Sequence, residues 1–176
     1  TMSDDAAGTL RTARLTLAKI VEMSGGLSRP GSQDDFGKLT DALSFYSEDS
    51  GNQVSSDFSS LTGSALLSVK TYCAMAAAAH RTATQLERLY KTTPAPDADS
   101  VSSAIKKFAV SVSEMRKAYS DLLPFVPLIK RLDAPCRSMI ESDAITDDFL
   151  MAFCDTVTAM AENIDRVQPE CDAAVS

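Results

Sequence analysis

The chain offers few residues for catalysis, and they are scattered along its 176 positions. Its single histidine, His80, would have to serve any Ser-His-Asp or Cys-His arrangement. It follows an alanine run inside an expected helix and has no nucleophile motif beside it. No Glu stands three residues before it, as the Glu-x-x-His pairs of di-iron bundles require. We therefore expect a surface or boundary histidine and predict that the chain is not an enzyme.

The four cysteines lie at positions 73, 136, 154 and 171 without a C-x-x-C pair, so they lack the clustering of a zinc site. We predict no metal and no other cofactor. Cys73 and Cys154 adjoin apolar positions and are expected at the edge of the core. Cys171 lies beyond Pro169 in an expected frayed tail, which makes it the most accessible thiol. This cysteine usage, without a signal peptide or membrane span, predicts a cytoplasmic setting; two disulfides in a secreted form are the alternative.

Two pairs of adjacent carboxylates are candidates for acid–base chemistry or metal binding. Asp34-Asp35 follows Ser32, and Asp147-Asp148 follows Thr146. A hydroxyl residue can cap a helix, and carboxylates in the first turn interact favourably with the helix dipole. We interpret both pairs as helix starts rather than as catalytic groups.

Basic residues gather in the middle of the chain. Residues 64–137 hold 11 basic and 6 acidic side chains, a net charge of +5, and the remainder holds 6 and 18, a net charge of −12. The total of −7 argues against general nucleic-acid binding, which depends on Lys and Arg displacing counterions. Adjacent basic residues on expected polar faces define a candidate partner-binding face: Lys106, Lys107, Arg116, Lys117, Lys130 and Arg131.

Helices must position these residues, because apolar side chains recur at alternating steps of four and three. The spacing predicts long helices over 65–90 and from about Ser100 to 122, with a break near Gly63. The first seam is Ala65, Val69, Tyr72, Ala76, Ala79, Ala83, Leu86 and Tyr90. The second is Val101, Ile105, Phe108, Val112, Met115, Tyr119 and Leu122.

Glycine, proline and capping residues set the other expected boundaries. A helix is predicted over residues 4–23, with Leu10, Ala13, Leu17 and Ile20 on one stripe. A shorter helix over 32–46 and a turn over 47–52 follow. A short helical segment is expected to close at Pro135, and a last long helix to run from Thr146 to Pro169.

No stretch alternates with a period of two, so we predict an all-α antiparallel bundle of three to four long helices with short covering helices. Residues 1–176 are expected to form a single domain, with 1–3 and 169–176 frayed. The predicted function is a non-catalytic protein–protein interaction module, an adaptor, scaffold or assembly domain that uses a helical face. A protein partner is expected, and homo-oligomerisation stays open. The alternatives are a carrier of an apolar ligand such as a fatty acid or sterol, and anionic-membrane binding through the basic middle.

Overall fold

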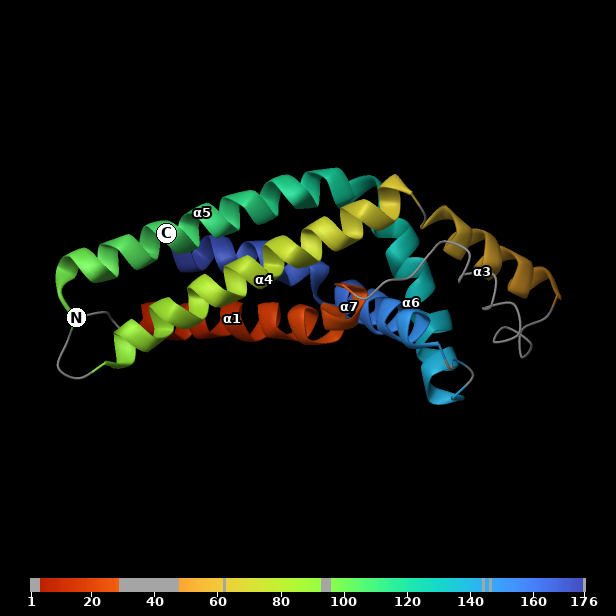
Figure 1. Ribbon diagram of the computed structural model, residues 1–176, viewed down its shortest axis with the longest axis horizontal. Helices are drawn as coiled ribbons and strands as arrows, with labels where there is room; N and C mark the ends of the chain where they lie inside the picture. Colours follow the sequence, from red (N-terminus) through yellow and green to blue (C-terminus); the bar gives the residue numbers. More distant parts are fainter. Residues whose placement is uncertain are drawn as a thin grey trace. The chain divides into compact units, whose positions relative to one another are not determined.

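The computed structural model describes residues 4–28, 48–61, 63–92, 96–143, 145 and 147–175, and these residues contain no strand. Their long helices pack against one another, which confirms the predicted all-α bundle. The elements, shown in Figure 1, are α1 (Asp4–Ser24), η1 (Gly25–Ser28), α3 (Glu48–Ser60), α4 (Ser64–Lys91), α5 (Ala98–Leu122), η3 (Leu123–Phe125), α6 (Val126–Glu141) and α7 (Asp148–Val175).

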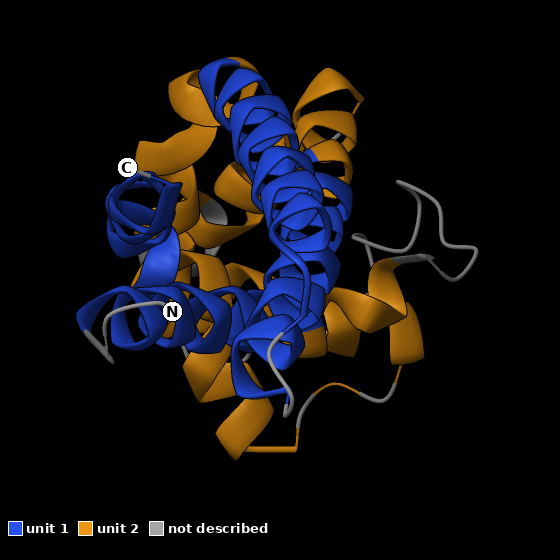
Figure 2. Cartoon of the chain, turned by 90° about the vertical axis from the view of Figure 1, so that its left-hand side faces the viewer, with its two compact units in different colours: residues 1–21, 72–120, 163–176 blue, residues 22–71, 121–162 orange. Residues whose placement is uncertain are grey.

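The chain forms two compact units, coloured separately in Figure 2. Unit 1 comprises residues 1–21, 72–120 and 163–176, and it contains most of α1, α4 and α5 with the end of α7. Unit 2 comprises residues 22–71 and 121–162, and it contains α3, α6, η1, η3, the first turns of α4 and the part of α7 up to residue 162. Each unit therefore combines segments that are far apart in the sequence. The single-domain prediction for residues 1–176 stays a prediction.

The predicted apolar stripes form the buried core. On α1, Leu10, Ala13, Leu17 and Ile20 are all buried. On α4, every predicted seam residue from Ala65 to Leu86 is buried, and Tyr90 is half-buried. On α5, the buried side chains include Phe108, Val112, Met115 and Leu122. Ile105 is an exception at 38% exposed, and Val101 and Tyr119 are half-buried.

Unit 2 has its own aromatic core. The rings of Phe58 on α3 and Phe153 on α7 lie 6.0 Å apart, and both side chains are buried. Asp57 accepts a hydrogen bond from Arg131, 3.3 Å away, which links α3 to α6. Apolar burial and one polar bridge thus hold α3 within the unit.

Local chemistry accounts for three helix boundaries. Asp97 caps α5, since its Oδ1 accepts the backbone N–H of Ser100 at 2.7 Å. Asp147 caps α7 in the same way, accepting the N–H of Leu150 at 3.0 Å. Gly63 has a φ of +59° between α3 and α4, which confirms the predicted break at this residue.

Three predicted boundaries are wrong, and each error has a packing reason. Residues 48–60 form α3, although a turn was expected over 47–52, because the helix buries Val54 and Phe58. Pro135 lies inside α6, where it is itself buried. Pro169 lies inside α7, which continues to Val175, so residues 169–175 are not frayed. A proline costs a helix about 3 kcal/mol, which burial of several neighbouring side chains can offset.

The predicted helix over 32–46, with the Asp34-Asp35 pair, lies outside the described residues, as do residues 1–3 and Thr146.

Candidate functional site

Lys106, Lys107 and Val110 share one exposed face of α5 in unit 1. Val110 lies four residues after Lys106 and three after Lys107, and these spacings place side chains together on a helix surface. Val110 is 61% exposed, although it is aliphatic. Ser103 lies one turn earlier on the same face. The face therefore combines two cations with an uncovered apolar side chain.

An open groove follows this face between α4 and α5. It consists of two adjoining hollows of about 700 and 400 Å³ that share Ser103 and Lys107. The larger hollow is lined by Gln85, Arg88, Leu89, Asp97, Asp99, Ser100, Ser103, Ala104 and Lys107. The smaller is lined by Thr82, Ser103, Lys106, Lys107, Val110 and Ser111. We call the two hollows together the α4–α5 groove.

Charge changes along the α4–α5 groove. Asp97 and Asp99 line it at the start of α5, whereas Lys106 and Lys107 line it farther along the helix. With a rise of 1.5 Å per residue, Asp99 and Lys106 are about 10 Å apart along the helix axis. The α5 wall of the groove thus changes from acidic to basic along the helix, and α4 adds Arg88 beside the two carboxylates.

Asp97 is already engaged by the protein backbone. The Ser100 N–H that it accepts holds the pKa of the Asp97 carboxyl below its ordinary value. Its charge is therefore used to cap α5. Asp99 supplies the second exposed carboxylate at this end of the groove.

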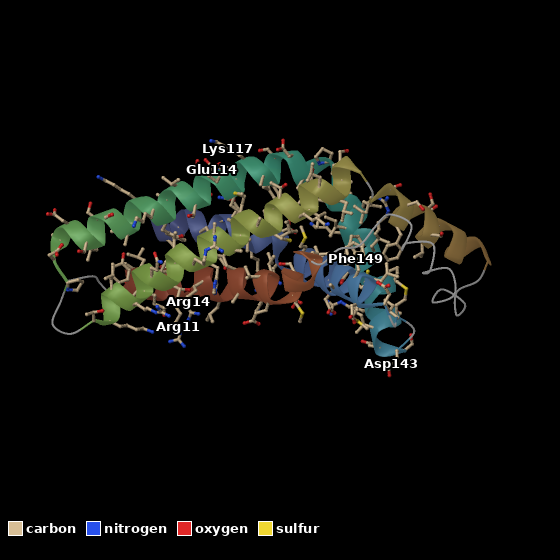
Figure 3. All side chains as sticks on the ribbon, in the orientation of Figure 1. Arg11, Arg14, Glu114, Lys117, Asp143 and Phe149 are labelled. Atoms are coloured by element: carbon tan, nitrogen blue, oxygen red, sulfur yellow. The ribbon has the colours of Figure 1, made fainter. Side chains whose placement is uncertain are left out.

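The six residues of the predicted partner-binding face are all exposed, and they are divided between the two units. Lys106, Lys107, Arg116 and Lys117 belong to α5 in unit 1, and Lys130 and Arg131 belong to α6 in unit 2. Acidic partners already neutralise some of them. Arg116 pairs with Asp172. Lys117 lies 3.3 Å from Glu114, and Figure 3 labels both side chains on α5.

Arg131 pairs with Asp57 in unit 2 at 3.3 Å. Lys106 and Lys107, by contrast, form no ion pair with any other described residue. These two lysines are therefore the part of the predicted face with charge left for a partner.

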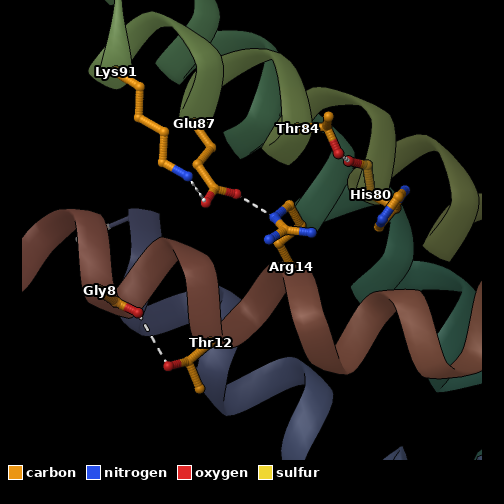
Figure 4. Close-up of polar contacts among 7 residues, drawn as sticks. All are labelled: Gly8, Thr12, Arg14, His80, Thr84, Glu87 and Lys91. Atoms are coloured by element: carbon orange, nitrogen blue, oxygen red, sulfur yellow. Dashed lines mark hydrogen bonds and ion pairs between the residues drawn. The ribbon is translucent and has the colours of Figure 1, made fainter.

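A second polar cluster joins α1 to α4 in unit 1 (Figure 4). Glu87 is buried and accepts hydrogen bonds from Arg14 and, at 3.0 Å, from Lys91. His80 lies on the same helix and is half-buried, as expected of a boundary residue. Its backbone oxygen accepts the Thr84 hydroxyl at 2.8 Å. The carboxylate of Glu87 is thus satisfied by two cations of the chain itself.

All four cysteines are buried thiols. The expectation that Cys171 is the accessible one is wrong, because α7 continues past Pro169 and carries Cys171 into the core at 0% exposure. Burial raises the pKa of the Cys171 thiol to about 12, which disfavours the reactive thiolate. Among the described residues, no group of three His, Cys, Asp or Glu side chains is placed to hold a metal ion.

Val110 was not among the residues predicted for the candidate face. It lies off the seam defined by Phe108 and Val112, three to four residues beyond the lysine pair. An outward-facing valine beside two outward-facing lysines was therefore readable from helical spacing alone.

No protein-family model matches the sequence, and no curated protein or solved structure shows significant similarity to the chain. None of the helices in the described ranges has both the length and the apolarity that a membrane crossing requires.

Proposed function

We propose that this chain is a non-catalytic protein-interaction module, an adaptor, scaffold or assembly domain, that binds an acidic segment of a partner protein in the α4–α5 groove. The observation that carries the proposal is the placement of Lys106 and Lys107 beside Val110 on the groove wall. Neither lysine has an ion-pair partner in the described part of the chain, and Val110 is largely uncovered. The expected setting is intracellular.

Electrostatics favour an occupant with carboxylates. Two neighbouring cations repel each other, and a carboxylate placed between them relieves this repulsion. Such exposed charge pairs mainly steer association and select partners, and they add modest affinity. Covering Val110 with an apolar side chain contributes about 1 kcal/mol more. An amphipathic acidic segment satisfies both requirements.

The distribution of charge between the units supports a basic docking surface in unit 1. The segments of unit 1 contain 11 basic and 9 acidic residues, a net charge of +2. Those of unit 2 contain 6 basic and 15 acidic residues, a net charge of −9. An acidic partner is therefore attracted to unit 1 and repelled by unit 2.

The two ends of the groove also select an orientation. Carboxylates of the bound segment belong near Lys106 and Lys107, and its amide or cationic groups belong about 10 Å away near Asp99. A segment bound in reverse would place like charges together along the α5 wall. The groove thus favours one direction of a charged segment.

Two alternative functions concern the same groove, namely carriage of an apolar ligand and binding to an anionic membrane. A fatty acid or sterol carrier needs apolar walls, whereas this groove contains Arg88, Asp97 and Asp99, which weakens that alternative. An anionic membrane would be attracted to the same lysines, in proportion to its content of acidic lipid. A crosslink to protein at this face identifies a protein partner, whereas binding to vesicles identifies a membrane.

Photo-crosslinking from position 110 tests the proposal. Val110 is replaced by the photo-reactive residue p-benzoylphenylalanine in the full chain, which is then irradiated in cells that naturally produce the protein. We expect a discrete protein adduct whose sequence at the crosslink is rich in Asp or Glu. The double change Lys106→Glu and Lys107→Glu should reduce the adduct at least tenfold. Lys19→Glu, an exposed change on α1 of the same unit, is the control and should leave it unchanged.

Three outcomes contradict the proposal. The first is the lack of any protein adduct at position 110, and the second is an adduct that survives both lysine changes. The third is binding to vesicles containing phosphatidylserine in a flotation assay, lost on the same lysine changes, because it assigns the face to a membrane. Circular dichroism of each variant shows that the helices are retained.

A further inference from the structure

An exposed acidic turn ends α6 in unit 2. It belongs to a stretch, residues 138–165, that contains seven acidic side chains and no Lys or Arg. Glu141 and Asp143 are both exposed, and neither forms an ion pair with any residue that the structure describes. Ile140 precedes them and is half-buried, so part of an apolar side chain stays accessible beside the two carboxylates. We call Ile140, Glu141 and Asp143 together the acidic turn.

Backbone hydrogen bonds hold the acidic turn in one conformation. The N–H of Ser142 donates to the carbonyl oxygen of Ser138 at 3.1 Å, and the N–H of Asp143 donates to that of Ile140 at 3.3 Å. Asp143 has a φ of +52°, a left-handed conformation that Asp adopts more readily than most residues. Figure 3 shows Asp143 at this end of α6. The carboxylates are therefore presented on an ordered backbone, which lowers the entropic cost of docking.

The acidic turn is complementary to the basic part of the α4–α5 groove. Lys106 and Lys107 line the groove without an ion-pair partner in the described ranges, and Val110 beside them is 61% exposed. Two uncompensated carboxylates beside an isoleucine thus match two uncompensated lysines beside a valine. Because both surfaces belong to the same chain, every copy of the protein carries each of them.

We propose that the acidic turn of one copy docks in the α4–α5 groove of a second copy. This inference rests on the proposed function and identifies its acidic partner as the chain itself. The carboxylates of the turn pair with Lys106 and Lys107, and Ile140 contacts Val110. The two sides of the contact differ, so the association is head-to-tail. A dimer therefore keeps one free groove and one free acidic turn, to which further copies can add.

Electrostatics determine the strength of this contact and its dependence on salt. Exposed ion pairs add little affinity each, and a contact made by one turn is small, so the association is weak and reversible. Each copy has a net charge of −7, which makes two copies repel each other at long range. At about 0.15 M salt, charges farther apart than about 8 Å are largely screened, whereas the docked charges are in contact. We therefore expect association at this salt concentration and its loss at about 1 M.

Zero-length crosslinking between isotope-labelled copies tests the proposal. Equal amounts of unlabelled and ¹⁵N-labelled chain are mixed and treated with a carbodiimide, which joins a lysine amine to a carboxylate in direct contact. After digestion with trypsin, Glu141 and Asp143 fall in the peptide 138–166. We expect this peptide to be linked to Lys106 or Lys107 in pairs that combine one labelled and one unlabelled peptide. Such a mixed pair can arise only between two copies.

Exchange of charges provides a second test, measured by sedimentation equilibrium. A groove variant carries Lys106→Glu with Lys107→Glu, and a turn variant carries Glu141→Lys with Asp143→Lys. Each variant alone places like charges at the contact, so its association constant should fall at least tenfold. An equimolar mixture of the two variants restores opposite charges at both possible contacts. We therefore expect the mixture to associate as the wild type does.

Control variants separate the contact from general effects of charge and folding. Asp121→Lys changes another exposed carboxylate of unit 2, and Lys19→Glu changes an exposed lysine of unit 1; both should leave association unchanged. Because lysine is unfavourable at the positive φ of residue 143, a second turn variant combines Glu141→Gln with Asp143→Asn. It removes both charges and should also weaken association at least tenfold. Circular dichroism shows that each variant keeps its helices.

Two results overturn the inference. One is a wild-type chain that gives no mixed-isotope link at Lys106 or Lys107, and the other is a mixture of groove and turn variants that associates no better than either alone. The photo-crosslink from Val110 then shows whether the proposed function fails as well. An adduct in cells with an acidic segment of a different protein retains the proposed function, whereas the lack of any protein adduct removes both.

Discussion

Arg14 on α1 and Glu87 on α4 form an ion pair inside unit 1, although 73 positions separate them in the sequence. The side chain of Glu87 is only 8% exposed, and that of Arg14 is 23% exposed. Lys91 provides a second cation 3.0 Å from the other carboxylate oxygen. A buried carboxylate is tolerated only when its charge is compensated, so this cluster fixes how α1 meets α4.

A double-mutant cycle should detect this coupling. We expect Arg14→Ala to lower the free energy of unfolding by about 1–2 kcal/mol, because Glu87 then retains only the more exposed Lys91. In the Glu87→Ala background, Arg14→Ala should lower the free energy of unfolding by about 1 kcal/mol less than it does in the wild type. Urea unfolding of the wild type, both single variants and the double variant gives the coupling energy. Additive effects would show that the contact does not contribute to stability.

The same carboxylate predicts a pH dependence. Burial opposes its ionisation, but hydrogen bonds from Lys91 and Arg14 outweigh burial and hold the pKa of Glu87 below its ordinary value of 4.5. A depressed carboxyl pKa contributes stability that is present above the unfolded-state pKa and is lost as pH falls through the folded-state pKa. The difference in unfolding free energy between wild type and Glu87→Gln should therefore shrink below about pH 4.5. A difference that stays constant from about pH 7 to pH 3 would contradict this assignment.

Replacement of Gly26 in η1 by a larger residue is expected to destabilise the protein. A Cβ at this position would lie 2.6 Å from the Cβ of Ala152 on α7, within unit 2. Gly26→Ala should therefore lower the free energy of unfolding by about 1–3 kcal/mol. The neighbouring Gly25 is the matched control, because a Cβ there meets no heavy atom within 4 Å. Chemical denaturation that finds equal effects for Gly25→Ala and Gly26→Ala would refute the close approach.

The hydroxyl of Tyr72 should contribute little to the free energy of unfolding. Its side chain is fully buried, and its Oη has no hydrogen-bond partner among the described residues. The ring lies 6.2 Å from that of Tyr119, a contact that phenylalanine would keep. Because an unsatisfied buried hydroxyl is unfavourable, Tyr72→Phe should leave stability unchanged or raise it by about 1–2 kcal/mol. A loss above about 1 kcal/mol in urea unfolding would show that the hydroxyl is satisfied.

Helical periodicity predicted much of the fold because it depends on neighbouring residues. The steps of four and three identified the buried seam of α4 and, except for Ile105, the buried or half-buried seam of α5. The start of α7 at the Asp147-Asp148 pair was also readable, although Asp147, which was expected in the first turn, is the residue that accepts the Leu150 N–H as the cap. Exposure of Lys106 and Lys107 followed from their positions off the seam.

Proline positions show where local rules failed. Pro135 and Pro169 both predicted helix ends, yet α6 and α7 continue through them. A proline lowers the stability of an isolated helix, but tertiary burial of Cys136 and Cys171 beyond these prolines adds contacts that a local rule does not include. The predicted exposure of Cys171 was wrong for the same reason.

Residue spacing along the chain specifies which residues are helical seams, which faces are polar and where Gly63 interrupts the helices, because these properties depend on residues within a few turns. The packing of distant segments brings Glu87 to Arg14 and Arg116 to Asp172, and leaves Lys106 and Lys107 without an ion pair to any other described residue. Contacts between distant segments depend on how several helices pack at once. Many pairings of amphipathic faces bury similar apolar area, so periodicity alone does not select among them.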